Sequence, residues 1–480
     1  MLWSPRHAGG ANVTGAPDSQ KDSPFNRIAA KVREKRRGVM FKVQLTDFRC
    51  FAEKAKPVEI LPITFLVGEN SAGKTTFLAA ARLLLESSFR TPQNPFNRDP
   101  YFLGGFDQIA HYRGGMKGRA KKFSLSLEIP STETGAPVPR SRRQTMTTRH
   151  TFTFIKGSPQ PNLSEYKFTT PMGSVILNLS EKKPSLKVVK PDENQSIDIP
   201  FEGSRLPPVD LLRKDLSYLR FVFDELTYGR NPKDKTEYLP TELLDQFRSS
   251  FSFARKRVFA SAPVRTQPFR TYTPSEMTAS SEGSHVPLEM ARQRMDSPEE
   301  WKSTHEKLAR FGKNSGLFDD IDIRLLGKKD GDPFQIVVRT GGPPVNIVDV
   351  GYGVSQALPI IYQLEQTRVH DFFFLQQPEV HLHPRAQAAL GTLIAGLSKQ
   401  RPTSAYVVET HSDYIIDRVR MEIAEKRLDH RNVTIVFFDK REHEVITENI
   451  YLSSSGDIVD PPDNFRKFFL EEHSRLLGID

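Results

Sequence analysis

The segment GENSAGKTT, from Gly68 to Thr76, has the residue types and the spacing of a phosphate-binding loop. Its glycines allow the backbone N–H groups to turn inward around phosphates, next to the positive end of the helix that follows. Lys74 is expected to reach the β- and γ-phosphates of ATP, and Thr75 to place its hydroxyl on Mg²⁺. ATP and Mg²⁺ are therefore the predicted cofactors. The predicted nucleotide contacts from this loop are Gly68, Glu69, Asn70, Ser71, Ala72, Gly73, Lys74, Thr75 and Thr76.

The segment FFFLQQPEVHLHP contains the strand that should carry the acids of the metal site. Phe372 to Leu375 form its buried part, and Gln376 and Gln377 stand where an acid pair is expected. A glutamine can accept a hydrogen bond from metal-bound water, but it carries no charge and cannot abstract a proton. We therefore predict slow or partner-dependent hydrolysis, with Gln376 beside the metal and Gln377 at the catalytic position. The alternative is that Glu379, the first acid after the strand, takes the place of the missing acid.

Two further segments place polar residues at the ends of apolar elements. In DVGYGVSQ, small residues and a Ser-Gln pair precede a helix, which is a second anion-binding geometry. In VVETHSD, a strand ends on polar residues, and His411 is well placed to contact a γ-phosphate or the attacking water. The two histidines of HLHP also suggest a metal site, but no acid or cysteine ligands lie near them in sequence.

The elements that position these residues follow from the apolar pattern. The alternation from Phe41 predicts a half-buried strand, and a second apolar run, Ile60 to Val67, leads directly into the glycines. Lys74 to Ser87 then has helical spacing, which completes the strand, loop and helix that a P-loop requires. A polar stretch, Thr271 to Pro298, is predicted to be a surface loop.

Composition and charge limit the class of protein. The 480 residues carry a net charge of +10, and residues 1–39 contain eight Lys or Arg and three acids, so this tail holds half of the excess. We predict that the tail is disordered; it is either an extension of a protein that starts at Met40 or a basic arm that contacts nucleic acid. No apolar run is long enough to span a bilayer, and the single Cys50 excludes an internal disulfide. The expected location is the cytoplasm, away from membranes.

Six segments together, in this order, resemble the ABC-type ATPases of the SMC and OLD (overcoming lysogenization defect) group, and most closely their bacterial AAA-type relatives. The segments are DFRCF, GENSAGKTT, APVRTQP, DVGYGVSQ, QQPEVHLHP and VVETHSD. The resemblance covers about Phe41 to Phe438. It implies an α/β fold, namely a P-loop NTPase of ABC-ATPase type with an inserted β-rich lobe and a helical segment.

The resemblance also implies roles for residues outside the P-loop. They are Arg49 near the phosphates, Gln108 as a Q-loop residue at the metal, Gly353, Ser355 and Gln356 in the signature loop, His383 on the D-loop and His411 as the switch histidine. In this family the signature loop caps the ATP of a second subunit. The implied assembly is a head-to-head dimer, or a higher oligomer, with two ATP molecules between the subunits.

Domain boundaries are predicted from the same motifs. The segments are a disordered basic tail (1–39), the N-terminal part of the ATPase core with the P-loop (40–121), a β-rich lobe (122–205), a helical insertion and loop (206–320), the C-terminal part of the core with signature, Walker B, D-loop and switch histidine (321–440), and a C-terminal strand and helix (441–480).

Full OLD nucleases carry a Toprim nuclease domain after the ATPase, but no DxD pair follows His411 here. The first hypothesis is therefore an ATPase that regulates a separately encoded effector, a nuclease, in anti-phage defence, as in Septu and PARIS systems. A second hypothesis is a DNA-stimulated ATPase of repair or recombination, with the tail and Arg265 or Arg270 on DNA. A third is a scaffold that holds ATP without hydrolysing it.

Overall fold

The computed structural model describes most of the chain after the basic tail. The described residues are 38–86, 95–130, 145–179, 184–190, 196–199, 206–219, 221–222, 225, 241–253, 257–274, 280–329, 331–465 and 474–475. The predicted disorder of the tail and most of the predicted C-terminal helix therefore lie outside the described residues. Among the helices within these ranges, none is long and apolar enough to cross a membrane.

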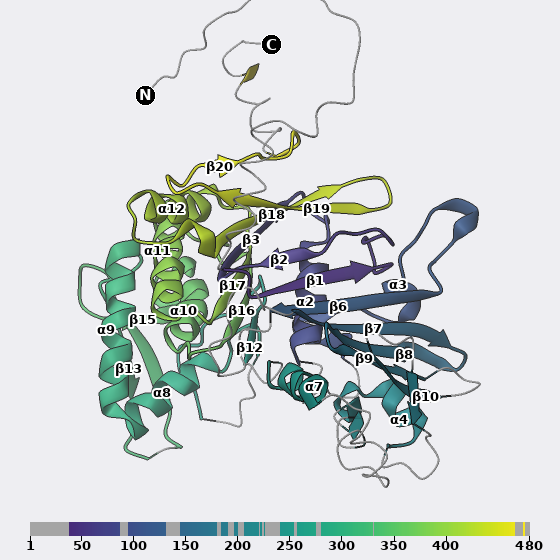
Figure 1. Cartoon of the computed structure of the whole chain (residues 1–480). Coiled ribbons are helices and arrows are strands. Elements are labelled where there is room, and N and C mark those ends of the chain that lie inside the picture. Colours follow the sequence, from purple (N-terminus) through teal and green to yellow (C-terminus); the bar gives the residue numbers. More distant parts are fainter. Residues whose placement is uncertain are drawn as a thin grey trace, which may run out of the picture. The chain divides into compact units, whose positions relative to one another are not determined.

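A seven-stranded sheet, here called the core sheet, carries the P-loop (Figure 1). In spatial order the strands are β12 (Val258–Ser261), β16 (Phe372–Gln376), β17 (Ala405–Glu409), β3 (Ile63–Gly68), β18 (Val433–Lys440), β19 (Val445–Leu452) and β20 (Ile458–Val459). The first five strands of this order are parallel, and the last two are antiparallel. Parallel strands all end at the same edge of a sheet, so their last residues are brought together there.

The parallel strands of the core sheet are buried on both faces. Successive side chains of β16 alternate between two apolar clusters: Phe372 and Phe374 belong to one, and Phe373 and Leu375 to the other. This is why the strand reads as a continuous apolar run in the sequence rather than as an alternating one.

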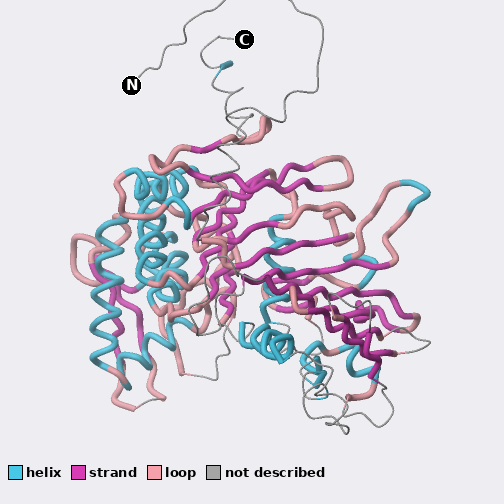
Figure 2. The backbone as a smooth tube through the Cα atoms, in the orientation of Figure 1, coloured by secondary structure: helices cyan, strands magenta, loops and turns pink. Residues whose placement is uncertain are grey.

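A second sheet of eight antiparallel strands forms the β-rich lobe (Figure 2). In spatial order it contains β11 (Ser196–Ile199), β10 (Ser185–Val189), β9 (Gly173–Asn178), β8 (Ser158–Thr170), β7 (Thr145–Ile155), β6 (Lys122–Pro130), β1 (Phe41–Thr46) and β2 (Val58–Ile60). The first strand of the chain therefore joins this lobe, because it pairs with β2 and β6. Conversely, β12 joins the core sheet although it was assigned to the helical insertion.

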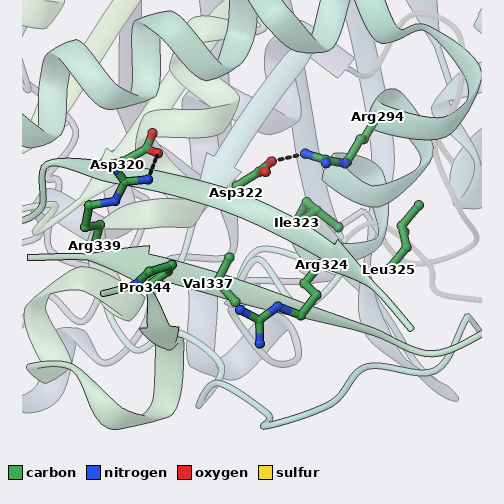
Figure 3. Close-up of a pocket in the computed structure, with 9 residues that line it drawn as sticks. All are labelled: Arg294, Asp320, Asp322, Ile323, Arg324, Leu325, Val337, Arg339 and Pro344. Carbon is green, nitrogen blue, oxygen red and sulfur yellow. Dashed lines mark hydrogen bonds and ion pairs between the residues drawn. The ribbon is translucent and has the colours of Figure 1, made fainter. Parts of the chain in front are cut away.

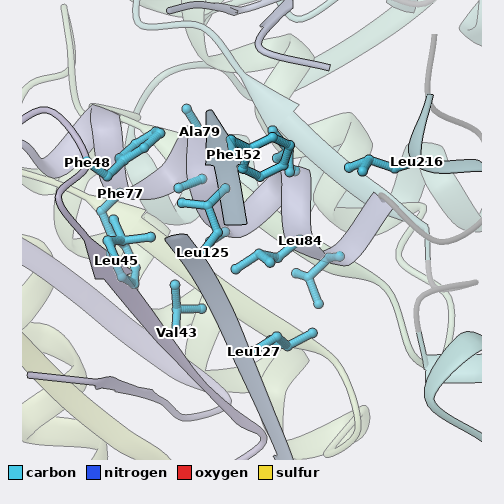
Figure 4. Close-up of a cluster of buried hydrophobic side chains, with 14 of the residues drawn as sticks. Val43, Leu45, Phe48, Phe77, Ala79, Leu84, Leu125, Leu127, Phe152 and Leu216 are labelled. Carbon is cyan, nitrogen blue, oxygen red and sulfur yellow. The ribbon is translucent and has the colours of Figure 1, made fainter. Parts of the chain in front are cut away.

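Helix α2 (Lys74–Glu86) follows the P-loop and packs between the two sheets. Figure 4 shows the apolar cluster around it: Phe77 and Leu84 of α2 lie among Leu45 of β1 and Leu125 and Leu127 of β6. The P-loop is thus held between the core sheet and the lobe. The predicted α/β P-loop fold with an inserted β-rich lobe is confirmed.

The opposite face of the core sheet is covered by helices (Figure 1). These are α8 (Val286–Asp296), α9 (Pro298–Ser315), α10 (Tyr352–Glu365), α11 (Pro384–Gln400) and α12 (Asp413–Ala424), with a small sheet of β13 (Asp320–Leu325), β14 (Phe334–Arg339) and β15 (Val345–Asn346). The shorter or peripheral elements are β4 (Asn97–Arg98), β5 (Tyr101–Phe102), α3 (Phe106–Ile109), η2 (Gly115–Lys117), α4 (Val209–Lys214), η4 (Leu216–Leu219), α7 (Thr241–Phe253), η5 (Ile347–Asp349) and η6 (His430–Asn432).

The prediction of a surface loop from Thr271 to Pro298 is wrong in its second half. Residues 286–296 form α8, and Val286, Leu288 and Met290 are buried. The helix was missed because the polar stretch TASSEGSH comes before it and Pro298 after it, so only a short helical period is visible. Its stability comes from packing against α9 and α10 rather than from its own sequence.

Phe438 on β18 connects the core sheet to the P-loop helix. Its side chain is 1% exposed, and its ring centroid lies 5.9 Å from that of Phe77 and 6.4 Å from that of Phe51. Phe438→Ala should lower the free energy of unfolding by about 3–5 kcal/mol, because a buried ring is lost and a cavity is left. Urea unfolding would measure this. Phe154→Ala is the control, since that ring is 49% exposed; equal losses in the two variants would contradict the prediction.

Candidate nucleotide site

The P-loop lies between the end of β3 and the start of α2, as predicted. Gly68 and Gly73 have φ values of +143° and +89°. A Cβ at Gly68 would lie 2.5 Å from the carbonyl oxygen of Phe438, and one at Gly73 would lie 2.4 Å from the Sγ of Cys50. Both positions therefore need glycine, for backbone conformation and for space. The Cys50 thiol is a packing neighbour of the loop, and burial raises its pKa to about 11.

Lys74 is buried, and its side chain folds back over the loop. Its Nζ donates to the carbonyl oxygens of Gly68 (3.0 Å) and Glu69 (2.8 Å). Burial lowers the pKa of Lys74, while the nearby carboxylates of Glu409 and Glu379 oppose this shift. A phosphate oxygen would be a stronger partner than either carbonyl, because both groups would then carry charge.

Glu409, the last residue of β17, is the acid that meets the P-loop. The Thr75 hydroxyl lies 2.9 Å from its Oε2 and 3.1 Å from its Oε1. On the neighbouring strand, Gln376 is its direct register partner. Burial raises the pKa of Glu409, and this shift is opposed by the hydrogen bond from Thr75, the charge of Lys74 and a hydrogen bond with Gln376.

Sequence reasoning missed Glu409. The sequence pattern places the acid after Phe372–Leu375, where Gln376 and Gln377 stand, whereas Glu409 ends the next strand of the sheet. The signal was present in VVETHSD, in which an acid follows an apolar run two residues before His411.

The segment after β16 places the other predicted catalytic residues. Gln377 has φ +41°, and its backbone N–H donates to the carbonyl oxygen of Glu409 (2.8 Å). Glu379 is buried, and its Oε1 accepts from the backbone N–H of His411 (2.7 Å). Burial raises the pKa of Glu379, whereas loss of solvent and the charge of Lys74 lower the pKa of His411. Both shifts favour the neutral forms of these side chains.

Arg265, in the loop after β12, is buried against the segment that follows β16. Its side chain is 2% exposed, and Nη2 donates to the carbonyl oxygen of Gln377 (3.1 Å). Burial lowers the pKa of Arg265 to about 10, and the charge of Glu379 opposes the shift. In this structure the guanidinium supports the backbone of Gln377 and is shielded from solvent. Arg270 is exposed and donates to the carboxylate of Asp349.

The signature residues lie at the first turns of α10. Ser355 and Gln356 are buried, and the Ser355 hydroxyl donates to the carbonyl oxygen of Tyr352 (2.9 Å). Tyr352 is 43% exposed, and its ring meets that of His381 edge-on at 5.0 Å. The part of the signature segment that faces solvent is therefore its start, Gly351 and Tyr352.

Two other residues of the predicted site, Gly353 and His383, lie against or within the segment that precedes α11. Gly353 packs against the D-loop, because a Cβ there would lie 2.8 Å from the carbonyl oxygen of His381. His383 caps α11 by accepting from the backbone N–H of Arg385 (3.3 Å).

Arg49 and Gln108 both hold the loop around α3. The Nη2 of Arg49 donates to the carbonyl oxygen of Leu103 (2.8 Å), and burial lowers the pKa of Arg49. The side-chain oxygen of Gln108 accepts from the backbone N–H of Gly105 (2.9 Å) within α3. In this structure the Gln108 amide is thus engaged by its own turn. A role at the metal would instead require this amide to point toward Thr75.

The oxygen donors at the sheet edge fit Mg²⁺. Thr75 brings a hydroxyl, Gln376 an amide and Glu409 a carboxylate, and their hydrogen bonds already hold them together. Mg²⁺ takes only one or two protein oxygens and completes its shell with water and phosphates. Among the described residues, no group of three or more His, Cys, Asp or Glu is arranged to hold a metal ion; this includes the HLHP segment.

A separate cavity of about 450 Å³ lies on the small sheet (Figure 3). Two of its three arginines pair with its two aspartates: Arg294 with Asp322, and Arg339 with Asp320 (3.3 Å). Arg324 leaves one positive charge over in the lining.

Comparison with known proteins adds three findings. The family model described as "AAA domain, putative AbiEii toxin, Type IV TA system" matches residues 196–417, which include the signature segment and His411 but not the P-loop. An OLD nuclease from Thermus scotoductus (strain ATCC 700910 / SA-01) is 36% identical over an alignment of 118 residues, and the match covers 21% of this chain and 21% of that protein. The chain is therefore similar to AAA-type ATPases and, over a shorter segment, to an OLD nuclease.

Solved structures that resemble the fold include heads of SMC proteins. An Smc head bound to the C-terminal winged-helix domain of ScpA has a TM-score of 0.45 and 13% identity, and covers 86% of this chain and 98% of that chain. The head from Thermotoga maritima has a TM-score of 0.38 and 11% identity, with 86% and 100% covered. These likenesses are too distant to carry an argument about function.

Gly73→Ala should weaken both the fold and ATP binding. The added Cβ would press on the Cys50 thiol, and alanine disfavours a φ of +89°. We expect a loss of about 1–3 kcal/mol in the free energy of unfolding, measured in urea. Adding Cys50→Ala should recover part of this loss. Gly342→Ala is the control, because no described atom lies within 4 Å of a Cβ there; a loss as large at Gly342 would count against the packing argument.

Proposed function

We propose that this protein is an ABC-type ATPase that binds ATP and Mg²⁺, hydrolyses ATP slowly, dimerises around it and regulates a separately encoded effector. The observation that carries the proposal is the meeting of three groups at the edge of the core sheet. The Lys74 ammonium, the Thr75 hydroxyl and the Glu409 carboxylate lie together there. A cation for the phosphates, a hydroxyl for the metal and an adjacent acid are what a P-loop site uses to bind Mg·ATP.

Slow hydrolysis is supported by the residues beside this site. Gln377 has no charge, and Arg265 and Glu409 hold its backbone in a left-handed conformation. Glu379 is the acid of this segment, and its Oε1 is already engaged by the backbone N–H of His411 (2.7 Å). A change that rearranges the segment, such as binding of a partner, would therefore be needed for fast turnover.

Dimerisation is supported by the exposure of the signature segment. Gly351 and Tyr352 form the solvent-facing start of α10, and a helix N-terminus attracts anions. In a head-to-head dimer this end of α10 would face the ATP bound to the P-loop of the other subunit.

The effector is proposed to be a nuclease that acts in anti-phage defence. This part of the proposal is supported by the resemblance of the motifs to the OLD group and by the segment that is similar to an OLD nuclease. Purified alone, the protein should bind ATP but leave DNA intact in the presence of Mg²⁺ or Mn²⁺. DNA cleavage that is lost with a variant of its own residues would sink the idea of a separate effector.

The molar mass of the purified chain tests the dimer. Sedimentation velocity should show the mass at least doubling when ATP and Mg²⁺ are added, and ADP should not produce the change. A mass that is the same with ATP, with ADP and without nucleotide would reject ATP-dependent assembly.

Gln377→Glu tests the restraint on turnover, because a large gain in hydrolysis would show that the natural residue limits the rate.

A further inference from the structure

The core sheet lacks a carboxylate at the position where a P-loop site usually has one. Gln376 ends β16 and offers only a neutral amide. The hydroxyl of Thr75 is a weak ligand by itself, and Mg²⁺ prefers charged oxygen donors. A site that binds Mg·ATP therefore needs a negative charge from another element.

Glu409 has the position that such a carboxylate requires. It ends β17, which lies between β16 and the P-loop strand β3, and its register partners are Gln376 on one side and Leu66 on the other. Paired residues of neighbouring strands project from the same face of a sheet. The amide of Gln376 and the carboxylate of Glu409 thus point to the same space, next to Thr75.

The hydrogen bond from Thr75 shows how the carboxylate would act. A hydroxyl has one proton and two lone pairs, so it can bind a cation through oxygen only if its proton points elsewhere. Both carboxylate oxygens of Glu409 lie within hydrogen-bond distance of Thr75 Oγ1, at 3.1 and 2.9 Å. Accepting this proton leaves the lone pairs of Thr75 free for the metal, and the second carboxylate oxygen free for metal-bound water.

The other buried acid of the site has a different partner. Glu379 accepts from the backbone N–H of His411, and the charge of Arg265 acts on it. Glu409 is the acid whose charge acts most strongly on Lys74. The two acids therefore have different hydrogen-bond partners: Glu379 contacts the backbone of His411, and Glu409 contacts Thr75 of the P-loop.

We propose that Glu409 supplies from β17 the carboxylate that holds the Mg²⁺ of bound ATP, in place of the neutral Gln376 on β16. The proposal rests on the proposed function, because it assumes that this site binds Mg·ATP. It places the negatively charged ligand of the metal on β17, whereas the sequence pattern predicts it on β16.

Glu409→Gln is the direct test, because glutamine keeps an oxygen that can accept from Thr75 and removes only the charge. Binding of ATP is measured by calorimetry in EDTA and in Mg²⁺, and binding of Mn²⁺ to the ADP complex by electron paramagnetic resonance. In EDTA, the affinity for ATP should be equal to or higher than that of the wild type. The affinity for Mn²⁺ should fall at least about tenfold, the usual loss when a residue that supports a metal site is changed.

The double variant with Glu409→Gln and Gln376→Glu tests whether Mn²⁺ binding depends on the carboxylate charge or on its position at residue 409. The carboxylate then moves to the adjacent strand position, and most of the Mn²⁺ affinity should return. Glu422→Gln is the matched control, since Glu409 and Glu422 are each 5% exposed and Glu422 lies on α12; it should leave Mn²⁺ affinity unchanged. Urea unfolding of each variant confirms that the compared proteins are folded.

The outcomes separate this proposal from the proposed function. A wild-type protein that does not bind ATP even in EDTA would contradict the proposed function. A folded Glu409→Gln variant that binds Mn²⁺ as tightly as the wild type would overturn the role of Glu409 and leave ATP binding intact. If Glu409→Gln does not fold, the double variant with Gln376→Glu is used in its place. A double variant that folds but does not bind Mn²⁺ also overturns the proposal.

Discussion

A Lys74→Ala variant should bind ATP at least about tenfold more weakly than the wild type and hydrolyse it at the background rate. A hydrogen bond to a charged group contributes about 1.5–3 kcal/mol, which is about ten- to a hundredfold in affinity. The structure places this ammonium against the carbonyl oxygens of Gly68 and Glu69. The negative charges of Glu409 and Glu379 also act on it. Removing it takes away the cation that acts on Glu409, so the phosphates would meet more negative charge.

Calorimetry and a coupled phosphate-release assay would measure the two effects. Lys302→Ala is the control, because Lys302 is an exposed residue of α9. The control should match the wild type in both assays. Retention of normal ATP affinity by Lys74→Ala would show that the nucleotide is bound elsewhere.

Two inactive variants mixed together should recover about a quarter of the wild-type rate. The first is Lys74→Ala, and the second is Gly351→Glu, which places a negative charge at the exposed start of α10. Gly351 has φ −55° and ψ 140°, and no described atom lies within 4 Å of a Cβ built there. The substitution should therefore leave the fold intact and repel only the phosphates of a partner's ATP.

The reason for the recovery is the composition of a shared site. If each site combines the P-loop of one subunit with the signature segment of the other, a mixed dimer has one site with both defects and one with none. Random mixing makes about half of the dimers mixed, and each has one of two sites intact.

ATP hydrolysis of the separate and mixed proteins checks this expectation. Gly351→Gln, which has nearly the same size but no charge, should keep much more activity than Gly351→Glu. Activity of the mixture that equals the mean of the separate proteins would show that each chain completes its own site.

The nucleotide loop could be predicted from the sequence because its residues are contiguous. Gly68 to Thr76 contain both the glycines that the backbone requires and the residues predicted to contact phosphate, and a strand and a helix adjoin them. The β-rich lobe was predicted for the same reason, since alternation and turn residues are local signals. Local signals failed at α8, where packing against other helices stabilises a short helix after a polar stretch.

The contacts of other predicted functional residues could not be predicted in this way. Arg265 was considered as a DNA contact, but the fold buries it beneath Gln377, which is 112 positions away in the chain. Gln108 was assigned to the metal, but its amide oxygen closes its own turn at Gly105. In both cases the side chain type allowed several roles, and the neighbours that the fold supplies selected one.

By itself, the sequence determined that this chain has an α/β P-loop fold with a β-rich lobe, and that two glutamines stand where acids were expected. The tertiary structure decided which acid meets the loop. Thr75 and Glu409 are 334 positions apart, and they meet only because β17 lies between β16 and β3. The order of strands in a sheet depends on the packing of the whole domain, and no spacing within a motif encodes it.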